Sequence, residues 1–319
     1  MTTFLLPHKL RYDWRLPEEP MNSKMLFNAL TVAATVLLAA AATAQNAPQD
    51  FSQVQIKTTK ISDKFYTLEG QGGMIGALVG PDGVFLVDTQ YAGLTQKIVA
   101  AVKAISPSPI KFVVNTHVHG DHTGGNENFG KLGAVIFSRD QLRARLANPG
   151  GTAQPAPAAA LPIVTYDGPV TLHMNGEEIQ LIPIRAAHTD GDTLVRFPGL
   201  DVLMTGDYYR SIQYPNIDRA NGGSLNGMLE GLGATIGMAG PNTKIIPGHG
   251  PTVNRSAVVA HRDMILVLRD RVAQAIKEGK NAQQIVAAKV TADYDSKVEQ
   301  VGTTADRFVN QLYAELGGK

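Results

Sequence analysis

Apolar and polar residues alternate with a period of two in several short segments after residue 50, and turn residues separate these segments. Such alternation is typical of half-buried strands. The turn signal Pro81-Asp82-Gly83 separates the last two of them. We therefore expect strands at 55–58, 64–68, 74–79 and 83–87.

A helical period follows, because apolar residues from Leu94 to Val102 recur at the spacing of one helix face. We expect a helix at 91–105, ended by Pro107 and Pro109. The next segments predict a strand at 110–115, a strand at 134–137, a helix at 139–146 and an irregular Pro/Ala/Gly loop at 148–161.

A second series of strands fills the later part of the chain. It is predicted at 170–174, 178–184, 193–197 and 202–205, followed by a helix at 224–239, a strand at 244–246 and further helices beyond Gly250. Strands open each half of the chain and helices close it. This order favours two β-sheets packed face to face with helices outside.

The N-terminal segment has a different character. Residues 21–45 contain Lys24, an apolar stretch from Leu26 and the small residues Ala42-Thr43-Ala44, as a secretory signal peptide does. A transmembrane anchor is the alternative, but the stretch is short and rich in Ala and Thr. We expect residues 1–44 to be an N-terminal extension and signal peptide cleaved near Ala44. The single domain at 45–319 would then be periplasmic or secreted, without a stable membrane anchor.

Composition excludes several functions. The chain has 319 residues and no cysteine, so it has no disulfide, no thiolate zinc site and no cysteine nucleophile. Its formal net charge of +1 provides no strong field for nucleic acid or anionic lipid. A small molecule is therefore the expected partner, and the oligomeric state stays open.

The string Asn115-Thr116-His117-Val118-His119-Gly120-Asp121-His122 is the most informative stretch. His117 and His119 point to the same side, because strand side chains repeat every two residues. Gly120 lets the chain turn, so that Asp121 and His122 reach the same place. Three imidazoles and a carboxylate at a strand end suit zinc, with iron or manganese as alternatives.

Three further candidate ligands each follow a predicted strand. His188 comes after the strand that ends near Ile184, Asp207 closes the strand at 202–205, and His249 follows the strand at 244–246. Taken alone, each fits a capping or loop role equally well. Together with the first string, they point to two metal ions.

This set of motifs resembles the metallo-β-lactamase-fold hydrolase superfamily, over about residues 51–275. The resemblance implies an α+β four-layer αββα sandwich with the metals at one edge of the sheets. It further implies that His117, His119 and His188 hold one zinc ion. Asp121, His122 and His249 would hold a second, and Asp207 would bridge the two.

The sequence departs from the metallo-β-lactamases that have a cysteine at the position of Asp207. An aspartate there resembles the glyoxalase-II-like, lactonase and phosphodiesterase branches. We expect an exported dinuclear zinc hydrolase that opens a small cyclic amide or ester, a β-lactam or a lactone. The alternatives are a glyoxalase-II-like thioesterase, an iron-dependent persulfide or oxygen redox enzyme, and a non-catalytic metal-binding protein.

Other residues are candidates for supporting roles. Asp121 is expected to orient the attacking water as well as bind metal, and Tyr208 or Tyr209 either donates to the developing oxyanion or packs in the core. The loops at 71–73 and 148–161 are expected to border the pocket. A histidine that binds metal through one ring nitrogen needs a hydrogen-bond partner for the other one. The candidate partners are Asp88, Thr116, Asp190 and Asp192. His173 and His261 belong to no pattern.

Overall fold

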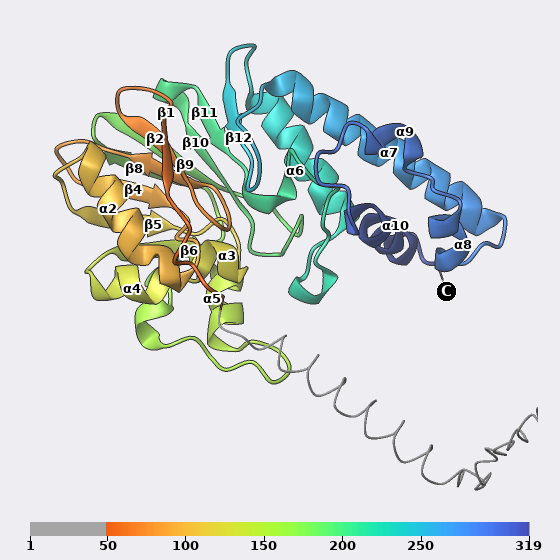
Figure 1. Cartoon of the computed structure of the whole chain (residues 1–319), viewed down its shortest axis with the longest axis horizontal. Helices are drawn as coiled ribbons and strands as arrows, with labels where there is room; N and C mark the ends of the chain where they lie inside the picture. The colour runs from red at the N-terminus through yellow and green to blue at the C-terminus, as the bar shows by residue number, and fades with distance from the viewer. Residues whose placement is uncertain (1–48, 319) are drawn as a thin grey trace, which may run out of the picture. The chain divides into compact units, whose positions relative to one another are not determined.

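Two β-sheets packed face to face form the centre of the computed structural model, which describes residues 49–318 (Figure 1). The first sheet has seven strands in chain order: β1 (Lys57–Lys60), β2 (Phe65–Glu69), β3 (Ile75–Leu78), β4 (Val84–Val87), β5 (Ile110–Val114), β6 (Val135–Arg139) and β7 (Val164–Tyr166). Strands β1 to β4 pair antiparallel, and β4 to β7 pair parallel.

The second sheet has five strands in the order β12 (Lys244–Ile246), β11 (Val202–Met204), β10 (Thr193–Phe197), β9 (Glu177–Pro183) and β8 (Val170–Met174). Its pairs are antiparallel from β8 to β11, whereas β11 and β12 are parallel. Strands β9, β11 and β12 therefore run in one direction, and their carboxyl ends meet at one edge of the sheet.

Apolar side chains fill the space between the sheets. Phe65 and Phe85 of the first sheet meet Phe197 of the second, with ring centroids 4.7 and 6.5 Å from that of Phe197. All three side chains are fully buried. Since aromatic rings bury large apolar areas and these join both sheets, they hold the two halves of the chain together.

Helices cover the outer face of each sheet, as Figure 1 shows. The first sheet packs on α2 (Thr95–Ile105) and α4 (Asn126–Lys131), and the second packs on α6 (Leu225–Met238), α7 (Arg255–Lys277) and α10 (Thr304–Glu315). The remaining helices are α3 (Gly120–Thr123), α5 (Asp140–Ala147), α8 (Ala282–Ala287) and α9 (Ala292–Asp295). The four layers confirm the αββα sandwich.

The observed bounds of helices and strands differ from the predicted ones at segments whose residues are largely exposed. Strand β1 lies at 57–60 rather than 55–58, and all four of its residues are exposed, so no apolar alternation marks it. Strand β7 was not predicted, because two of its three residues are exposed. The helix expected at 91–105 begins at Thr95, after a 3₁₀ turn at Ala92–Leu94.

The chain from Phe51 onward forms one compact unit. The predicted extension and signal peptide at 1–44 lie outside the described residues and stay a prediction. Within residues 49–318, no helix combines the length and the apolar character needed to cross a bilayer.

Replacing Phe197 with alanine should lower the free energy of unfolding by about 3–5 kcal/mol, because it leaves a cavity between the sheets. Denaturant unfolding of the metal-free protein measures this change. The control is Leu132→Ala at a side chain that is 57% exposed, with an expected change within about 0.5 kcal/mol. Equal effects of the two substitutions would show that Phe197 is not part of a tightly packed core.

Candidate metal centre

The chain after β5 brings the first four candidate ligands together. His117 and His119 follow the strand directly, and the short helix α3 then carries Asp121 and His122 back to the same place. His119 has an extended backbone at the start of this helix. One strand end and one helical turn therefore present four side chains to a single region.

The second sheet supplies the other three candidates from its edge. His188 lies in the turn between β9 and β10, Asp207 in a 3₁₀ turn after β11, and His249 in the loop after β12. Because β9, β11 and β12 run in the same direction, these loops emerge at the same edge.

The structure brings all seven predicted ligands together in two groups that share one carboxylate. In each group, the four ligand atoms lie within 4.8 Å of one another. The first group is His117, His119, His188 and Asp207, and the second group is Asp121, His122, Asp207 and His249. These are the two sets that the resemblance implies, including the shared position of Asp207.

Two imidazoles of the first group face each other at short distance. His188 Nδ1 donates to the carbonyl of Asn216 over 2.6 Å, and His119 Nε2 lies 2.7 Å from Asp218 Oδ2. When both rings are neutral and carry their protons on these outer nitrogens, the inner atoms His188 Nε2 and His119 Nδ1 both have lone pairs, and they are only 2.9 Å apart. A cation between them removes this repulsion.

Asp88 sets the orientation of the ligands next to β5. Its Oδ2 accepts hydrogen bonds from His122 Nδ1 and from the Thr116 hydroxyl, each over 2.7 Å. The Thr116 oxygen is then free to accept from His117 Nδ1 at 3.0 Å. The backbone of Asp88 has a φ of 67°, an uncommon conformation for a residue other than glycine. Asp88 and Thr116 thus occupy the supporting positions considered from the sequence.

Two polar atoms inside the cluster have no hydrogen-bond partner among the described residues. They are His117 Nε2 and Asp207 Oδ1, and both are buried. Buried polar atoms are nearly always satisfied in folded proteins. An imidazole nitrogen and a carboxylate oxygen left open at the centre of the two groups fit metal coordination.

The pKa values of the first group favour neutral imidazoles. Burial lowers the pKa of His188 to about 3. Burial, together with the charge on His122, holds the pKa of His117 well below its ordinary value. Both rings therefore present lone pairs at neutral pH, as metal ligation requires.

The second group is electrostatically different. Burial opposes the charged form of His122, but the carboxylates of Asp207 and Asp88 raise its pKa well above the ordinary value. Burial also opposes protonation of His249, and Asp207 and Asp121 outweigh it, so that its pKa is raised. The pKa of Asp121 falls to about 2 despite burial, because His249 and His122 stabilise its carboxylate.

Two glycines let the backbone approach the ligands closely. A Cβ atom on Gly73 would lie 2.1 Å from the His122 ring, and one on Gly248 would lie 1.9 Å from Asp207 Oδ1. The strands they flank are joined here, because Met74 N donates to the Gly248 carbonyl over 2.8 Å. Only a residue without a side chain fits at these two positions.

Comparison with known proteins now decides the family. A profile described as the Metallo-beta-lactamase superfamily matches residues 70–249, more than half of the chain. The chain belongs to the metallo-β-lactamase superfamily. Members of this superfamily are mostly hydrolases. The matched range contains all seven candidate ligands and ends at His249. Helices α7 to α10 of the chain lie beyond the matched range.

Solved structures agree on the fold. A metallo-β-lactamase from Pontibacter korlensis is 21% identical, with a TM-score of 0.56 over 66% of this chain and 99% of that protein. The DIM-1 metallo-β-lactamase is 16% identical, with a TM-score of 0.56 over 67% and 98%. The stereoselective inverting sec-alkylsulfatase Pisa1 from Pseudomonas sp. is 17% identical, with a TM-score of 0.63 over 82% of this chain and 50% of the sulfatase. The chain thus spans half the length of that sulfatase.

Three groups that contact the ligand residues are not indicated by the sequence pattern. They are the Asn216 carbonyl, Asp218 and Arg210. Arg210 donates from Nε to Asp207 Oδ2 over 2.9 Å and also contacts this oxygen through Nη2. Burial opposes ionisation of Asp207, but Arg210 and the histidines hold its pKa well below the ordinary value. No periodic pattern marks these residues, because they lie in the irregular loop after Asp207.

Two other predicted supports do not touch a ligand ring. Asp192 accepts from the backbone N–H groups of His188 and Thr189, so it fixes the turn rather than the imidazole. Asp190 pairs with Arg145 at 2.6 Å. Both residues stabilise the loop that carries His188.

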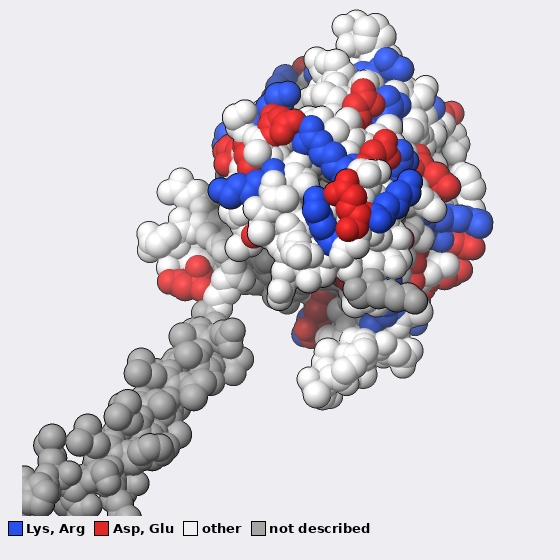
Figure 2. All heavy atoms as spheres, turned by 90° about the vertical axis from the view of Figure 1, so that its right-hand side faces the viewer, with Lys and Arg blue, Asp and Glu red and all other residues white. Residues whose placement is uncertain are grey.

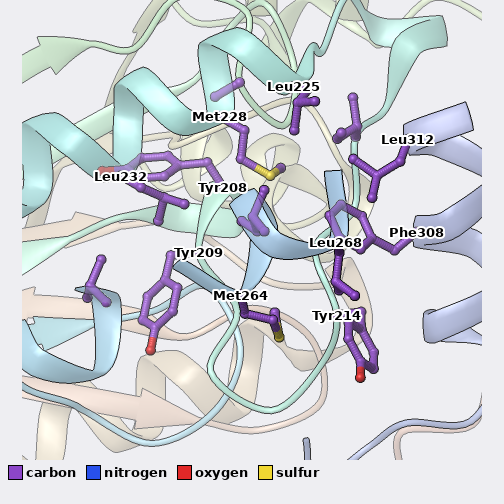
Figure 3. Close-up of a cluster of buried hydrophobic side chains, with 14 of the residues drawn as sticks. Tyr208, Tyr209, Tyr214, Leu225, Met228, Leu232, Met264, Leu268, Phe308 and Leu312 are labelled. Atoms are coloured by element: carbon purple, nitrogen blue, oxygen red, sulfur yellow. The ribbon is translucent and has the colours of Figure 1, made fainter. Parts of the chain in front are cut away.

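Both tyrosines are packed in the core, which is one of the two roles expected for them, and a catalytic hydrogen bond from either one stays a prediction. Tyr208 is buried and its hydroxyl lies 2.8 Å from Thr235 Oγ1 on α6. The ring of Tyr209 packs edge-on against His261 of α7, at 4.9 Å between centroids. Figure 3 shows both tyrosines among apolar side chains of the core outside the second sheet. Among the described residues, neither tyrosine side chain has a hydrogen bond or a ring contact with the seven ligands.

Each group borders its own cavity. A cavity of about 570 Å³ is lined by His249 of the second group, by the β1–β2 hairpin and by the segment 299–300. Another, of about 370 Å³, is lined by His119 of the first group and by residues 148–150. The predicted rims contribute to these walls, Gly72 to the first cavity and the 148–161 loop to the second.

Replacing Gly248 with alanine should lower metal affinity by at least about tenfold, because the new Cβ displaces Asp207 from both groups. Competition with a chromophoric chelator measures the affinity. Gly233→Ala is the matched control, since a Cβ on this α6 glycine meets no atom within 4 Å. Unchanged affinity in Gly248→Ala would contradict the shared role of Asp207.

Metal bound by the second group should be lost first as pH falls. The raised pKa values of His122 and His249 mean that metal must displace protons there, which weakens binding by up to about tenfold per pH unit for each proton. His117 and His188, with lowered pKa values, hold no proton to displace. Metal content after dialysis between about pH 8 and about pH 6 measures the effect. Parallel loss of both ions would contradict it.

Proposed function

We propose that this chain is an exported dinuclear zinc hydrolase that opens a small cyclic amide or ester. The observation that carries the proposal is the pair of four-residue groups that share Asp207. One group would support a single structural or catalytic metal. Two groups joined by one carboxylate would hold two metal ions, and bound metal ions would supply an activated water for hydrolysis.

The donor atoms favour zinc. They are imidazole nitrogens and carboxylate oxygens, and the chain has no cysteine. Zinc takes this mixture readily, while iron and manganese accept it as well. When bound, zinc lowers the pKa of water to about 7 and polarises a substrate carbonyl.

The chain's own residues have distinct tasks in the proposed reaction. Asp121 is ionised and partly exposed, with Oδ2 at 3.0 Å from His249 Nε2, so it can accept a hydrogen bond from the attacking water and orient it. Asp207 contributes negative charge between the metal sites, and Arg210 keeps it ionised. No protein base is needed beyond these carboxylates.

The cavities set the scale of the substrate. Volumes of about 570 and 370 Å³ suit small molecules, and their walls mix polar and apolar residues. A β-lactam or a lactone is the first choice. A thioester is the alternative, and the similarity to an alkylsulfatase adds a sulfate ester to the compounds worth testing.

Surface charge supports a small-molecule partner rather than nucleic acid. On the face seen in Figure 2, Lys and Arg are interspersed with Asp and Glu. Several of the charges on α7 are paired, including Arg262 with Asp263, and Arg271 with Asp293. Export to the periplasm or outside the cell is proposed from the signal-peptide pattern at 21–45.

A substrate panel on zinc-loaded protein tests the proposal. It contains a chromogenic cephalosporin, a carbapenem, acyl-homoserine lactones, a glutathione thioester and a secondary alkyl sulfate. We expect turnover of a lactam or lactone, and a loss of at least about a hundredfold in kcat for Asp121→Asn or His119→Ala. If the protein turns over only the thioester or only the sulfate, that compound class would replace the cyclic amide or ester as the proposed substrate. Unchanged turnover in both variants would overturn the site.

Metal analysis of the same samples separates hydrolysis from redox chemistry. Two zinc ions per chain with hydrolytic turnover support the proposal. Iron as the native metal, with oxygen consumption or persulfide oxidation instead of hydrolysis, would favour the redox alternative.

A further inference from the structure

The loop at 210–218 holds two ligands of the first group from outside. The Asn216 carbonyl accepts from His188 Nδ1 at 2.6 Å, and Asp218 Oδ2 lies 2.7 Å from His119 Nε2. These contacts decide which nitrogen of each ring faces inward. The backbone of the loop is held at its two ends, where Ser211 N–H donates to the His249 carbonyl over 3.1 Å and Asp218 N–H donates to the His188 carbonyl over 3.0 Å.

A glutamine on α10 holds the same loop between these two contacts. The Ile217 N–H donates to Gln311 Oε1 over 3.0 Å, and Gln311 Nε2 donates to Asn216 Oδ1 over 2.8 Å. The amide orientation follows from the partners, because a backbone N–H requires an acceptor. Gln311 is therefore hydrogen-bonded to Asn216, whose carbonyl accepts from His188, and to Ile217, which directly precedes Asp218.

The rest of the C-terminal segment supports the loop along its length. Gln300 N donates to the Ile212 carbonyl over 2.8 Å, and Arg307 Nη2 donates to the Tyr214 carbonyl over 3.3 Å. All these donors lie beyond His249, where the family match ends. Residues outside the matched range are thus hydrogen-bonded to the loop that holds His188 and His119.

We infer that Gln311 is a positioning residue for the first group: it sets His188 and His119 for metal binding by holding Asn216 and Ile217. The inference rests on the proposed dinuclear site and adds a dependence of that site on α10. Groups that orient ligand imidazoles commonly change metal affinity by about 10- to 100-fold when removed. Gln311 bonds the loop and not the ligand histidines themselves, so we expect a loss of metal affinity near the tenfold end of this range.

A crossed experiment isolates the first group. In a His249→Ala background the first group keeps all its ligands, and in a His188→Ala background the second group does. Zinc affinity is measured in each background by chelator competition, with and without Gln311→Met. We expect about a tenfold loss in the first background and no change in the second.

Two further variants separate positioning from general stability. Gln274→Met is the matched control, because this α7 glutamine is exposed and its side chain hydrogen-bonds only Glu278 within residues 49–318. Gln311→Glu should restore most of the affinity, since its carboxylate accepts from Ile217 N–H and from a reoriented Asn216 amide. The thermal midpoint of the metal-free protein, compared with that of Gln274→Met, reports the purely structural effect.

The outcomes are distinct. Loss in the first background only, with recovery in Gln311→Glu, supports the inference. Equal loss in both backgrounds, or no loss in either, overturns it while leaving the dinuclear site in place. Failure of zinc to bind in both backgrounds would overturn the proposed function and the inference with it.

Discussion

Electrostatic repulsion among inward-facing acceptors is the constraint on which this site depends. Five imidazoles and two carboxylates converge within a few ångströms, and the contacts to Asn216, Asp218 and Asp88 turn lone pairs toward the centre. Positive charge near these atoms stabilises the arrangement. Arg210 supplies part of it at Asp207, protons supply part of it in the second group through raised histidine pKa values, and the proposed metal ions would supply the rest.

The fold keeps the acceptors together by placing them on the turns, loops and short helix that follow strand ends. One sheet contributes four ligands after β5, and the other contributes three from neighbouring strand ends. The aromatic contacts of Phe65 and Phe85 with Phe197 fix the sheets against each other. Packing between the sheets therefore determines the separation of the ligands, while glycines at 73 and 248 allow the final close approach.

Much of this was predictable from the sequence. The string His117 to His122 and the later residues His188, Asp207 and His249 stand out because each follows an apolar strand, and the αββα order follows from the same periodicity. Arg210, Asp218 and Gln311 were missed, because they act from an irregular loop and a distant helix, and tertiary contacts alone bring them to the site. Tyr208 and Tyr209 drew attention by adjacency to Asp207, yet the 3₁₀ turn there directs them into the core.

The separate cavities have a consequence for the shape of a substrate. One lies beside His249 and the other beside His119, so each group of ligands borders a cavity of its own. Opening a ring leaves a single product, so the two cavities would receive substituents on opposite sides of one molecule rather than two fragments. A bulky substituent on one side would then be accommodated independently of the other side.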